Sequence, residues 1–424
     1  MTRWRLVAVG DLCNERVSQP RAFDEPFVQL IRSADVSVAN LEAPVTDRPA
    51  PSAKSGPSLS LTTPQATVLT GAGFGLFGIA NNHLFDHGLD GLTSTLEFLR
   101  SVGINGVGAG RTEADAYVPV VLDLGHVRVA VLAACEREFG VAEEGRGGVA
   151  AIDHPRFANA LVQARSAADV LVVMAHGGVE LSWVPPTHWA EQVRRLVDAG
   201  ADVVVGHHPH VVQGIERYGR GLIAYSLGDC YWPRSGGADD PRRAVGLALE
   251  VAFDGARLER FTARPLGLTH DYRLRLLVGE EEAAASAIIA RLSRLLVDRD
   301  VAAHLWETLA VKFYADRHQS RLFGSSRGAV RVRDLARYAA VGLQNFGSSL
   351  AGRPSRGTLR RQQLYLLNLL QNPSHRDVCI RGLQGLVSSA ESPEQRAALE
   401  EIDAIDREMT ALGRAVAQTG AAAG

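Results

Sequence analysis

Ala201-Asp-Val-Val-Val-Gly206-His207-His208-Pro209-His210 is the stretch from which the rest of the chain can be interpreted. Its apolar, β-branched part predicts a short buried strand over residues 202–205. Three histidines lie on the turn directly after this strand. Because Pro209 fixes its own φ, we expect it to hold the turn extended, so that His208 and His210 converge on one metal or on two. A solvated polar turn is the alternative interpretation.

The segments around this stretch alternate between strand-like and helix-like patterns. Short apolar runs predict strands over residues 6–9, 36–39, 76–80, 128–133, 169–174 and 222–226. Apolar residues at helical spacing predict helices over residues 27–33, 92–102 and 189–199. Alternation of this kind is typical of an α/β fold, in which ligands bind at the edge where the strands end.

Polar side chains gather just past the ends of these predicted strands. They are Asp11, Glu42, Asn82, His83, His176, His208 and His210. Taken singly, each is explained as well by a turn residue or by a hydrogen-bonded core histidine. Together on one sheet edge they favour a metal site, and their chemistry suits Zn, Mn, Fe or Ni better than Ca or Mg.

The composition is that of an ordinary globular protein. A chain of 424 residues, 46% hydrophobic and 22% charged, is long enough for two or three domains, and its net charge of −2 requires no polyanionic partner. Its four cysteines are far apart and do not suggest a disulfide framework. The first strand begins at Arg3 and no apolar run approaches 18 residues, so we expect a cytoplasmic, soluble protein.

Short motifs follow the predicted strands in order, and together they resemble the CapA-like capsule-synthesis family. They are Gly10-Asp11, Asn40-Leu41-Glu42, Asn81-Asn82-His83, His176-Gly177, Gly206-His207-His208-Pro209-His210 and Tyr225-Ser226-Leu227-Gly228. That family is similar to the calcineurin-like metallophosphoesterases. The resemblance covers about residues 5–265 and implies a four-layer α/β/β/α sandwich that holds two metal ions.

The resemblance also implies a role for each polar residue of the motifs. The implied ligands are Asp11 and His210 for one ion and Asn82, His176 and His208 for the other, with Glu42 bridging. His83 would be the acid/base residue over the site, whereas His207 matches no ligand and would support one from behind. We therefore expect a divalent transition metal, as two ions, to be the cofactor.

Three positions depart from the patterns of these families. Metallophosphoesterases open with Asp-x-His, but the third position here is Cys13, whose thiolate could replace the histidine on Zn or Fe. Glu42 stands where those hydrolases use Asp. Gly228-Asp229-Cys230 stands where CapA-like proteins usually have Gly-Asn and an aromatic residue. The hydrolytic site is therefore altered, which weakens a phosphatase interpretation without removing it.

Beyond about residue 265 the resemblance ends. A hairpin predicted over residues 247–264, with its turn at Asp254-Gly255, closes a first domain that we place at residues 1–268. A helical domain is expected over residues 280–424, with predicted helices at 280–297, 301–314, 332–346, 358–370, 375–387 and 394–416.

The helical domain contains a strongly basic stretch. Between Arg317 and Arg361 there are ten arginines and one acid, Asp334, which gives a local charge of +9. A solvated basic face is one interpretation, and nucleic-acid binding is weakly supported because aromatic residues are not interleaved. A carboxylate-bearing peptide fits better, with Arg317, Arg321, Arg327 and Arg331 as the candidate binding residues.

Two kinds of reaction suit such a site. One is phosphoester hydrolysis by a dinuclear metal centre, and the other is proton abstraction next to a carboxylate. The CapA-like family also resembles metal-dependent epimerases that act on the C-terminal residue of lasso-peptide precursors. We predict that branch, a peptide epimerase that inverts a Cα, with a phosphoesterase or a capsule-polymer (poly-γ-glutamate) biosynthesis protein as alternatives.

An epimerase needs a base on one face of Cα and a proton donor on the other. The candidates are His83, Asp11, Cys13, Asp229, Cys230 and His270, which lies in Thr269-His270-Asp271. Asp11 is equally well explained as a plain metal ligand. The expected partner is a peptide substrate, with neither nucleic acid nor membrane, and the sequence leaves homo-oligomerisation open.

Overall fold

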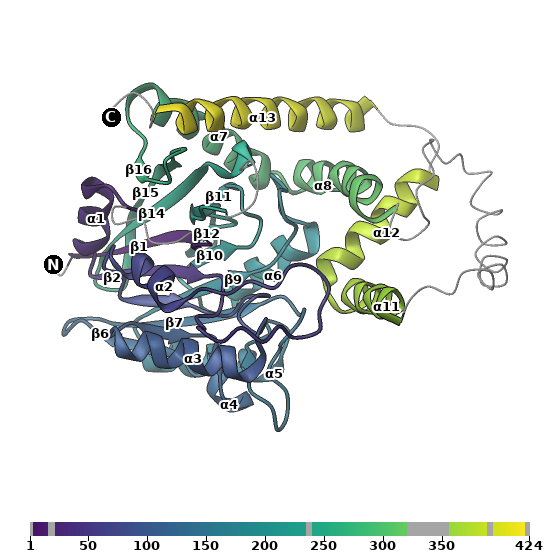
Figure 1. Cartoon of the computed structure of the whole chain (residues 1–424). Coiled ribbons are helices and arrows are strands. Elements are labelled where there is room, and N and C mark those ends of the chain that lie inside the picture. Colours follow the sequence, from purple (N-terminus) through teal and green to yellow (C-terminus); the bar gives the residue numbers. More distant parts are fainter. Residues whose placement is uncertain (1–2, 16–21, 235–239, 320–355, 388–392, 420–424) are drawn as a thin grey trace.

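Two β-sheets packed face to face form the centre of the protein (Figure 1). The computed structural model describes residues 3–15, 22–234, 240–319, 356–387 and 393–419. A hydrophobic cluster that includes Leu6 of one sheet and Val172 of the other fills the space between the sheets. Helices cover the outer face of each sheet and form further hydrophobic clusters with it.

The first sheet is parallel at its centre and ends in an antiparallel hairpin. Its strand order is β16-β15-β14-β1-β2-β3-β4, and β13 also pairs with β1. The bounds are β1 Arg3–Leu12, β2 Val36–Leu41, β3 Leu76–Gly78, β4 Asn105–Val107, β13 Asp229–Tyr231, β14 Val245–Asp254, β15 Arg257–Leu268 and β16 Leu274–Leu276. The predicted hairpin is confirmed, because β14 and β15 pair antiparallel up to Asp254 and Arg257.

The second sheet has the order β11-β12-β10-β9-β7-β6. Its bounds are β6 Val120–Asp123, β7 Arg128–Cys135, β9 Val170–His176, β10 Val203–His207, β11 Ile215–Tyr218 and β12 Gly221–Ala224. The strand predicted over residues 202–205 is confirmed as β10, which continues to His207. A separate two-stranded ribbon pairs β5 Ala109–Gly110 with β8 Gly148–Val149.

The burial pattern explains the order of the layers. In β1, Leu6 and Ala8 belong to the cluster between the sheets, whereas Val7 and Val9 belong to the outer cluster, as a strand with a period of two requires. The helices that complete the two outer layers are α1 Glu25–Arg32, α2 Thr63–Thr70, α3 Gly88–Ser101, α4 Glu113–Ala116, α5 Pro155–Ala167 and α6 Thr187–Asp198. The predicted four-layer α/β/β/α fold is confirmed.

The described part of the chain after residue 278 is built of helices. They are α7 Gly279–Val297, α8 Arg299–Phe313, the π-helical turn η2 Tyr314–Gln319, α11 Arg356–Gln371, α12 Pro373–Val387 and α13 Pro393–Gln418. Leu292, Trp306 and Ile405 of this segment share one hydrophobic cluster with Val193 of α6. The segment thus shares its core with the sandwich, and the division into two domains stays a prediction.

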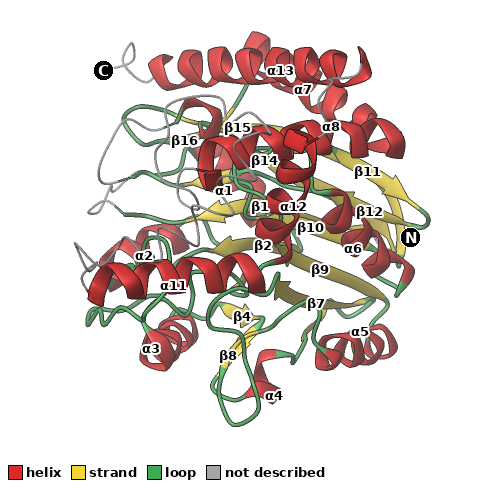
Figure 2. Ribbon diagram, turned by 90° about the vertical axis from the view of Figure 1, so that its right-hand side faces the viewer, coloured by secondary structure: helices red, strands yellow, loops and turns green. Residues whose placement is uncertain are grey.

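The helical segment covers one end of the sheets. In Figure 2, α8, α11 and α12 lie in front of the strands, and Figure 1 shows the same helices beside one end of them. Asn368 donates a hydrogen bond to Glu138 (3.0 Å) and Ser374 donates one to Glu136 (2.9 Å), both just past β7. Among the helices described, none combines the length and the apolar character needed to cross a membrane.

Candidate metal centre

The polar residues singled out in the sequence meet where the strands of both sheets end. Asp11 on β1 lies opposite Asn40 of β2 and Asp229 of β13, and His207 at the end of β10 lies opposite His176 at the end of β9. These pairings are parallel, so equivalent strand ends lie at the same edge. Both sheets therefore contribute polar residues of the motifs to this edge.

Three overlapping groups of potential ligand atoms occupy this edge. The groups are Asp11, Glu42 and His176; Glu42, His208 and His210; and Asp11, His210 and Asp229, with atoms within 4.8 Å of one another in each group. All six side chains are at most 5% exposed. Asp11, Glu42 and His210 each belong to two groups. The groups divide the ligands differently from the resemblance, which set Asp11 with His210 and His176 with His208.

The Asp11 carboxylate is fully engaged. Its Oδ1 accepts a hydrogen bond from Asn40 Nδ2 (2.9 Å) and lies 3.0 Å from His207 Nδ1. Its Oδ2 accepts one from the His208 backbone N–H (3.2 Å) and lies 3.3 Å from His210 Nδ1. Burial alone would raise the pKa of Asp11, but the contacts with His207 and His210 outweigh it and hold that pKa well below its ordinary value.

Glu42 is fully buried, and its two carboxyl oxygens have different surroundings. Its Oε2 accepts a hydrogen bond from Asn40 Nδ2, whereas its Oε1 lies 3.5 Å from His176 Nε2. Within the described part of the chain, Oε1 has no hydrogen-bond partner. Burial, followed by the charges of Asp11 and Asp229, raises the pKa of Glu42 well above its ordinary value. Glu42 Oε1 is therefore a buried acceptor whose charged form its surroundings disfavour.

The turn that carries His208 and His210 is tightly bent. The φ angles of His208 and His210 are +96° and +59°, so the prediction that Pro209 holds this turn extended is wrong. The hydrogen bond from the His208 N–H to Asp11 and another from Leu181 N–H to the Pro209 carbonyl (2.8 Å) hold the bend in place. A left-handed backbone at non-glycine residues is costly and clusters at functional sites. The bend keeps the two rings 5.9 Å apart.

A buried chain of charged contacts joins His210 to Asp229 and Arg243. His210 Nδ1 lies 2.9 Å from Asp229 Oδ1, and Arg243 Nε donates to Asp229 Oδ2 (2.6 Å). Burial and Arg243 oppose a charge on His210, but Asp229 and Asp11 prevail and raise its pKa to about 9. The edge of the Trp232 ring packs on His210 at a centroid distance of 4.9 Å.

His176, at the end of β9 in the second sheet, approaches residues that follow strands of the first sheet. Its Nε2 is 3.1 Å from Asn82 Oδ1, which places Asn82 at the border of the ligand groups. Burial, followed by the charge of His208, lowers the pKa of His176 well below its ordinary value, so the imidazole is neutral, as metal binding requires. Asn81 donates to Asn40 Oδ1 (3.1 Å) and to the Leu41 carbonyl (2.8 Å) and thereby supports the site.

His83 is held by two charged residues. Its Nδ1 lies 2.8 Å from Asp86 Oδ2, and Lys54 forms an ion pair with the other oxygen of Asp86. The Leu59 N–H also donates to Asp86 (2.7 Å), and the Lys54 side chain is only 5% exposed. Since Asp86 accepts the proton of Nδ1, Nε2 of His83 is left for proton transfer.

The other predicted site residues do not join the cluster. Cys13 and Cys230 belong to the hydrophobic cluster outside the first sheet, and burial raises the pKa of both thiols well above the ordinary value. His270 is exposed, and its backbone N–H donates to the Ala417 carbonyl (3.0 Å). Arg317 donates to the Glu180 carbonyl (2.9 Å) in the loop after β9. Arg321, Arg327 and Arg331 lie outside the described residues.

The residues present fit a divalent metal ion. Glu42 Oε1 and His208 Nδ1 are buried without a hydrogen-bond partner among the described residues, although both are metal-ligating atoms. Burial and the charges of Asp11 and Asp229 disfavour a charge on Glu42, and a cation held by the ligand groups would offset that cost. The cluster is therefore suited to binding a divalent metal.

A known protein family resembles this chain in sequence over its first half. Residues 5–233 match the family described as bacterial capsule synthesis protein PGA_cap. The chain belongs to this family. The match covers the strands that carry Asp11, His176 and His210, so the buried cluster lies within the family's region.

Individual relatives match only part of their own length. The PGA biosynthesis protein CapA of Bacillus subtilis is 31% identical over 233 residues, which are 52% of this chain and 61% of that protein. The capsule biosynthesis protein CapA of Bacillus anthracis is 30% identical over 208 residues, 47% of this chain and 51% of that protein. A solved structure of a phosphatase from Mycoplasma pneumoniae is similar over 63% of this chain and 94% of its own, with 12% identity and a TM-score of 0.39.

Sequence reasoning missed several residues that build the site. Asn40 touches Asp11 and Glu42, and Asp86 with Lys54 fixes His83. Asn40 and Asp86 had a signal, because each is a polar residue within a few positions of a chosen one. Lys54 lies in a Pro- and Ser-rich loop. Its signal was its rarity, because the chain has only two lysines. Arg243 had none, since only the fold brings it to Asp229.

Proposed function

We propose that this chain is a metal-dependent epimerase that inverts the Cα of a residue, at the C-terminus, in a ribosomal peptide precursor. The observation that carries this proposal is the buried cluster of carboxylates and imidazoles. His83, which Asp86 holds in place, follows directly after Asn82, whose Oδ1 lies 3.1 Å from His176 of the cluster. Position 13 lacks the histidine of the hydrolytic pattern, and its cysteine lies in the hydrophobic core. An acid/base reaction needs no such histidine.

The metal-binding residues in this proposal are those of the three ligand groups. Glu42, His208 and His210 would hold one ion, and Asp11, His176 and Asn82 border the position of a second. Imidazole-rich sets of this kind favour Mn, Zn, Fe or Ni. When bound, a divalent metal supplies positive charge that stabilises the negative charge formed when a proton leaves Cα.

The residues of the chain would bind, orient and exchange the proton. His83 would take up or release the proton at Nε2, while Asp86 holds its ring in one tautomer. Asp11 accepts contacts at both oxygens, so it acts here as an anchor of the cluster. His270 stays a candidate for the second proton carrier, because it lies on the wall of a neighbouring cavity.

Two alternatives have specific support. The sharing of Glu42 between two ligand groups is equally suited to a dinuclear phosphoesterase. One Bacillus relative is named for PGA biosynthesis and the other for capsule biosynthesis, which supports a role in making a capsule polymer. Both alternatives would use the same metal centre, so only the product of the reaction separates them from the epimerase.

An isotope experiment separates the three functions. The metal-loaded protein would be incubated in D₂O with synthetic peptides that differ in their C-terminal residue. An epimerase places one deuterium at Cα of the inverted residue, without cleavage, and His208→Ala abolishes this exchange. An aryl phosphate and a γ-linked glutamate oligomer serve as the competing substrates. Enzyme-like turnover of either one, with every peptide left unlabelled, would overturn the epimerase proposal.

A further inference from the structure

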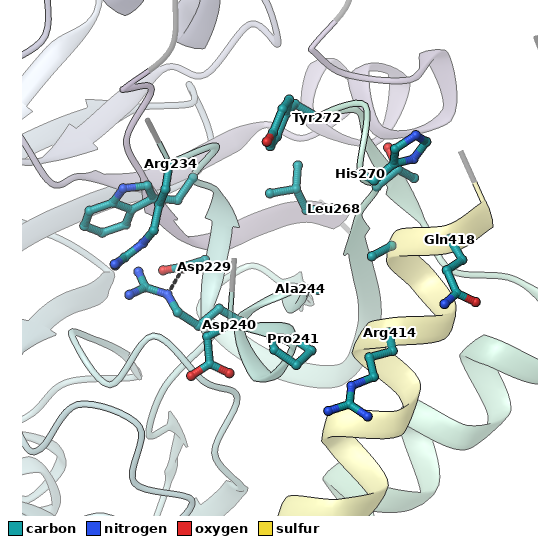
Figure 3. A pocket seen from close by; sticks show the side chains of 14 residues that line it. Asp229, Arg234, Asp240, Pro241, Ala244, Leu268, His270, Tyr272, Arg414 and Gln418 are labelled. Atoms are coloured by element: carbon teal, nitrogen blue, oxygen red, sulfur yellow. Dashed lines mark hydrogen bonds and ion pairs between the residues drawn. The ribbon is translucent and has the colours of Figure 1, made fainter. Parts of the chain in front are cut away.

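A cavity of about 460 Å³ adjoins the metal centre on the side of His210 (Figure 3). Asp229 forms part of its wall, and the same carboxylate contacts His210 Nδ1 at 2.9 Å. Trp232, whose ring edge packs on His210, lines the cavity as well. Asp229 therefore belongs both to the wall of this cavity and to a ligand group of the metal centre, so a ligand in the cavity would adjoin that centre.

Three arginines from separate elements line this cavity, which we call the arginine cavity. Arg234 follows β13, Arg243 ends the short 3-10 helix η1 Pro241–Arg243, and Arg414 lies near the end of α13. Figure 3 shows Arg234 and Arg414 on opposite sides of the cavity. Arg243 Nη2 is buried and has no hydrogen-bond partner within the described residues. A buried guanidinium nitrogen in this state indicates an anionic ligand.

The acids of the arginine cavity offset only part of this charge. Asp229 is already paired with both Arg243 and His210. Asp240 accepts from Arg242 at its Oδ1 (2.9 Å) and Oδ2 (2.5 Å). Arg414 is exposed and forms no ion pair with the part of the chain that the structure describes. The cavity is thus left with a positive field for a ligand.

The remaining wall of the cavity is apolar. Leu268, Tyr272, Ala244 and Ala417 contribute carbon-rich surface between the arginines. A small inorganic anion would leave this surface unused. A carboxylate carried on an apolar stem would use both parts, since guanidinium groups bind carboxylates in paired hydrogen bonds.

We propose that the arginine cavity is the subsite that binds a carboxylate group of the substrate next to the metal centre. This assignment rests on the proposed function in taking the ligand to be the substrate. The carboxylate has two sources: the C-terminus of a peptide, or the free α-carboxylates along a γ-linked glutamate polymer. Arg243 and Arg414 bind the carboxylate, and Leu268 and Tyr272 contact the apolar stem.

The packing of α13 makes the arginine cavity a built feature of the fold. A Cβ on Gly413 would lie 1.8 Å from the Pro241 carbonyl oxygen, so the helix touches η1 directly. The His270 N–H donates to the Ala417 carbonyl (3.0 Å) and fastens the helix to the loop after β15. Arg414 is therefore held at the rim by contacts in which its own side chain takes no part.

Binding is tested with probes on the metal-loaded protein. Labelling with 5-fluorotryptophan gives a fluorine NMR signal for Trp232, assigned through Trp232→Phe. N-acetyl-L-leucine should shift this signal, whereas the neutral N-acetyl-L-leucinamide should not. Arg414→Gln should weaken binding by about tenfold through loss of one charge-assisted contact. The matched control is Arg407→Gln, two turns earlier on α13 and outside the cavity, which should bind as the wild type does.

Further arms separate the sources and the metal. If γ-linked diglutamate binds more tightly than N-acetyl-L-leucine, with the same loss in Arg414→Gln, the proposal stands with the polymer as the source. Binding that survives removal of the metal by chelator supports the cavity itself. Equal affinities in Arg414→Gln and wild type, or a response only to inorganic phosphate, would overturn the proposal. Neither result depends on epimerase activity, so the two proposals fail separately.

Discussion

The metal centre and the arginine cavity share Asp229 but are built in different ways. The ligands of the metal centre lie within the first 229 residues, and all but Asp229, which begins β13, are near or just after the end of a strand. The arginine cavity takes its walls from β13, η1, β15 and the last helix, α13. One is therefore fixed by the two sheets, and the other depends on how a C-terminal helix packs on them.

This difference separates chemistry from selection. The buried centre keeps its donors in place through mutual contacts, such as those of Asp11 with Asn40 and His207. The cavity is open enough for exposed residues such as Arg414 to contribute. We expect changes in the centre to abolish metal binding and reaction, and changes in the cavity to alter affinity for the substrate.

The largest effect is expected at a metal ligand. His208→Ala removes one member of a ligand group. Loss of a residue that only supports a ligand lowers metal affinity by up to about 100-fold, so loss of a ligand should lower it by at least that much. Metal content after dialysis and loss of activity measure this directly. His126→Ala, at an exposed histidine, is the control and should retain metal. Full activity of metal-free protein in chelator would contradict the whole assignment.

The second prediction concerns the helix that closes the arginine cavity. In an ordinary helix Gly→Ala is stabilising, but Gly413→Ala would push a Cβ against the Pro241 carbonyl. We expect a loss of about 1–3 kcal/mol in the free energy of unfolding, with weakened carboxylate binding. Denaturant unfolding measures the first and the Trp232 signal the second. Ala415→Gly, on the exposed side of α13, isolates helix propensity. A stabilised Gly413→Ala would show that α13 does not touch η1.

The third prediction separates the residues that hold the metal from the residues that position His83. Asp86→Asn removes the charge that holds His83 but leaves every member of the ligand groups in place. We expect kcat to fall about tenfold, with metal content and KM unchanged, because the His83 ring loses the group that orients it. The Lys54 side chain, which is only 5% exposed, loses its ion pair as well, so the free energy of unfolding should also fall. Asp90→Asn, at an exposed acid in the first turn of α3, is the control. Loss of metal in Asp86→Asn would instead place His83 among the ligands.

The sequence was sufficient where a site is local to strand ends. Apolar runs identified the strands, and the polar residues just after them, such as Glu42 and His176, are the ones found together. Chain geometry was less accessible: Pro209 suggested an extended turn, but hydrogen bonds from elsewhere in the fold bend it. Gly206 gives a similar case, since a Cβ there would lie 1.8 Å from the Tyr225 carbonyl oxygen, a strand contact invisible in the sequence.

The arginine cavity could not be predicted for the same physical reason. Arg243 and Arg414 are 171 positions apart in the sequence, and only tertiary packing brings them to one cavity. The basic stretch that the sequence offered as a peptide site lies mostly outside the described residues, apart from Arg317 and the arginines of α11. Charge density in the sequence thus gave no indication of Arg243, which pairs with Asp229, or of Arg414 across the cavity wall.

The smallest effect is expected where the helical segment is joined to the sandwich. His188 of α6 lies 3.2 Å from Glu136 and 3.6 Å from Asp377 of α12. Burial opposes a charge on His188, but these two carboxylates prevail and raise its pKa from 6.5 to about 9. A raised pKa in the folded state contributes stability that is fully present below pH 6.5 and lost as the pH rises through about 9.

The unfolding free energy should therefore decline by about 1 kcal/mol between these two pH values, since 32% exposure of the side chain leaves the pairs partly screened. His188→Gln should remove the part of the decline that His188 contributes and leave the part that comes from His210, whose pKa is also raised to about 9. His126→Gln, at an exposed histidine, should keep the full decline. Urea unfolding at pH 6, 7.5 and 9 would measure the difference. Because Asp377 and Ser374 of α12 meet Glu136 and His188 here, the same change would also loosen the helices that cover the metal centre. An identical pH dependence in His188→Gln and wild type would show that this contact does not join the two regions.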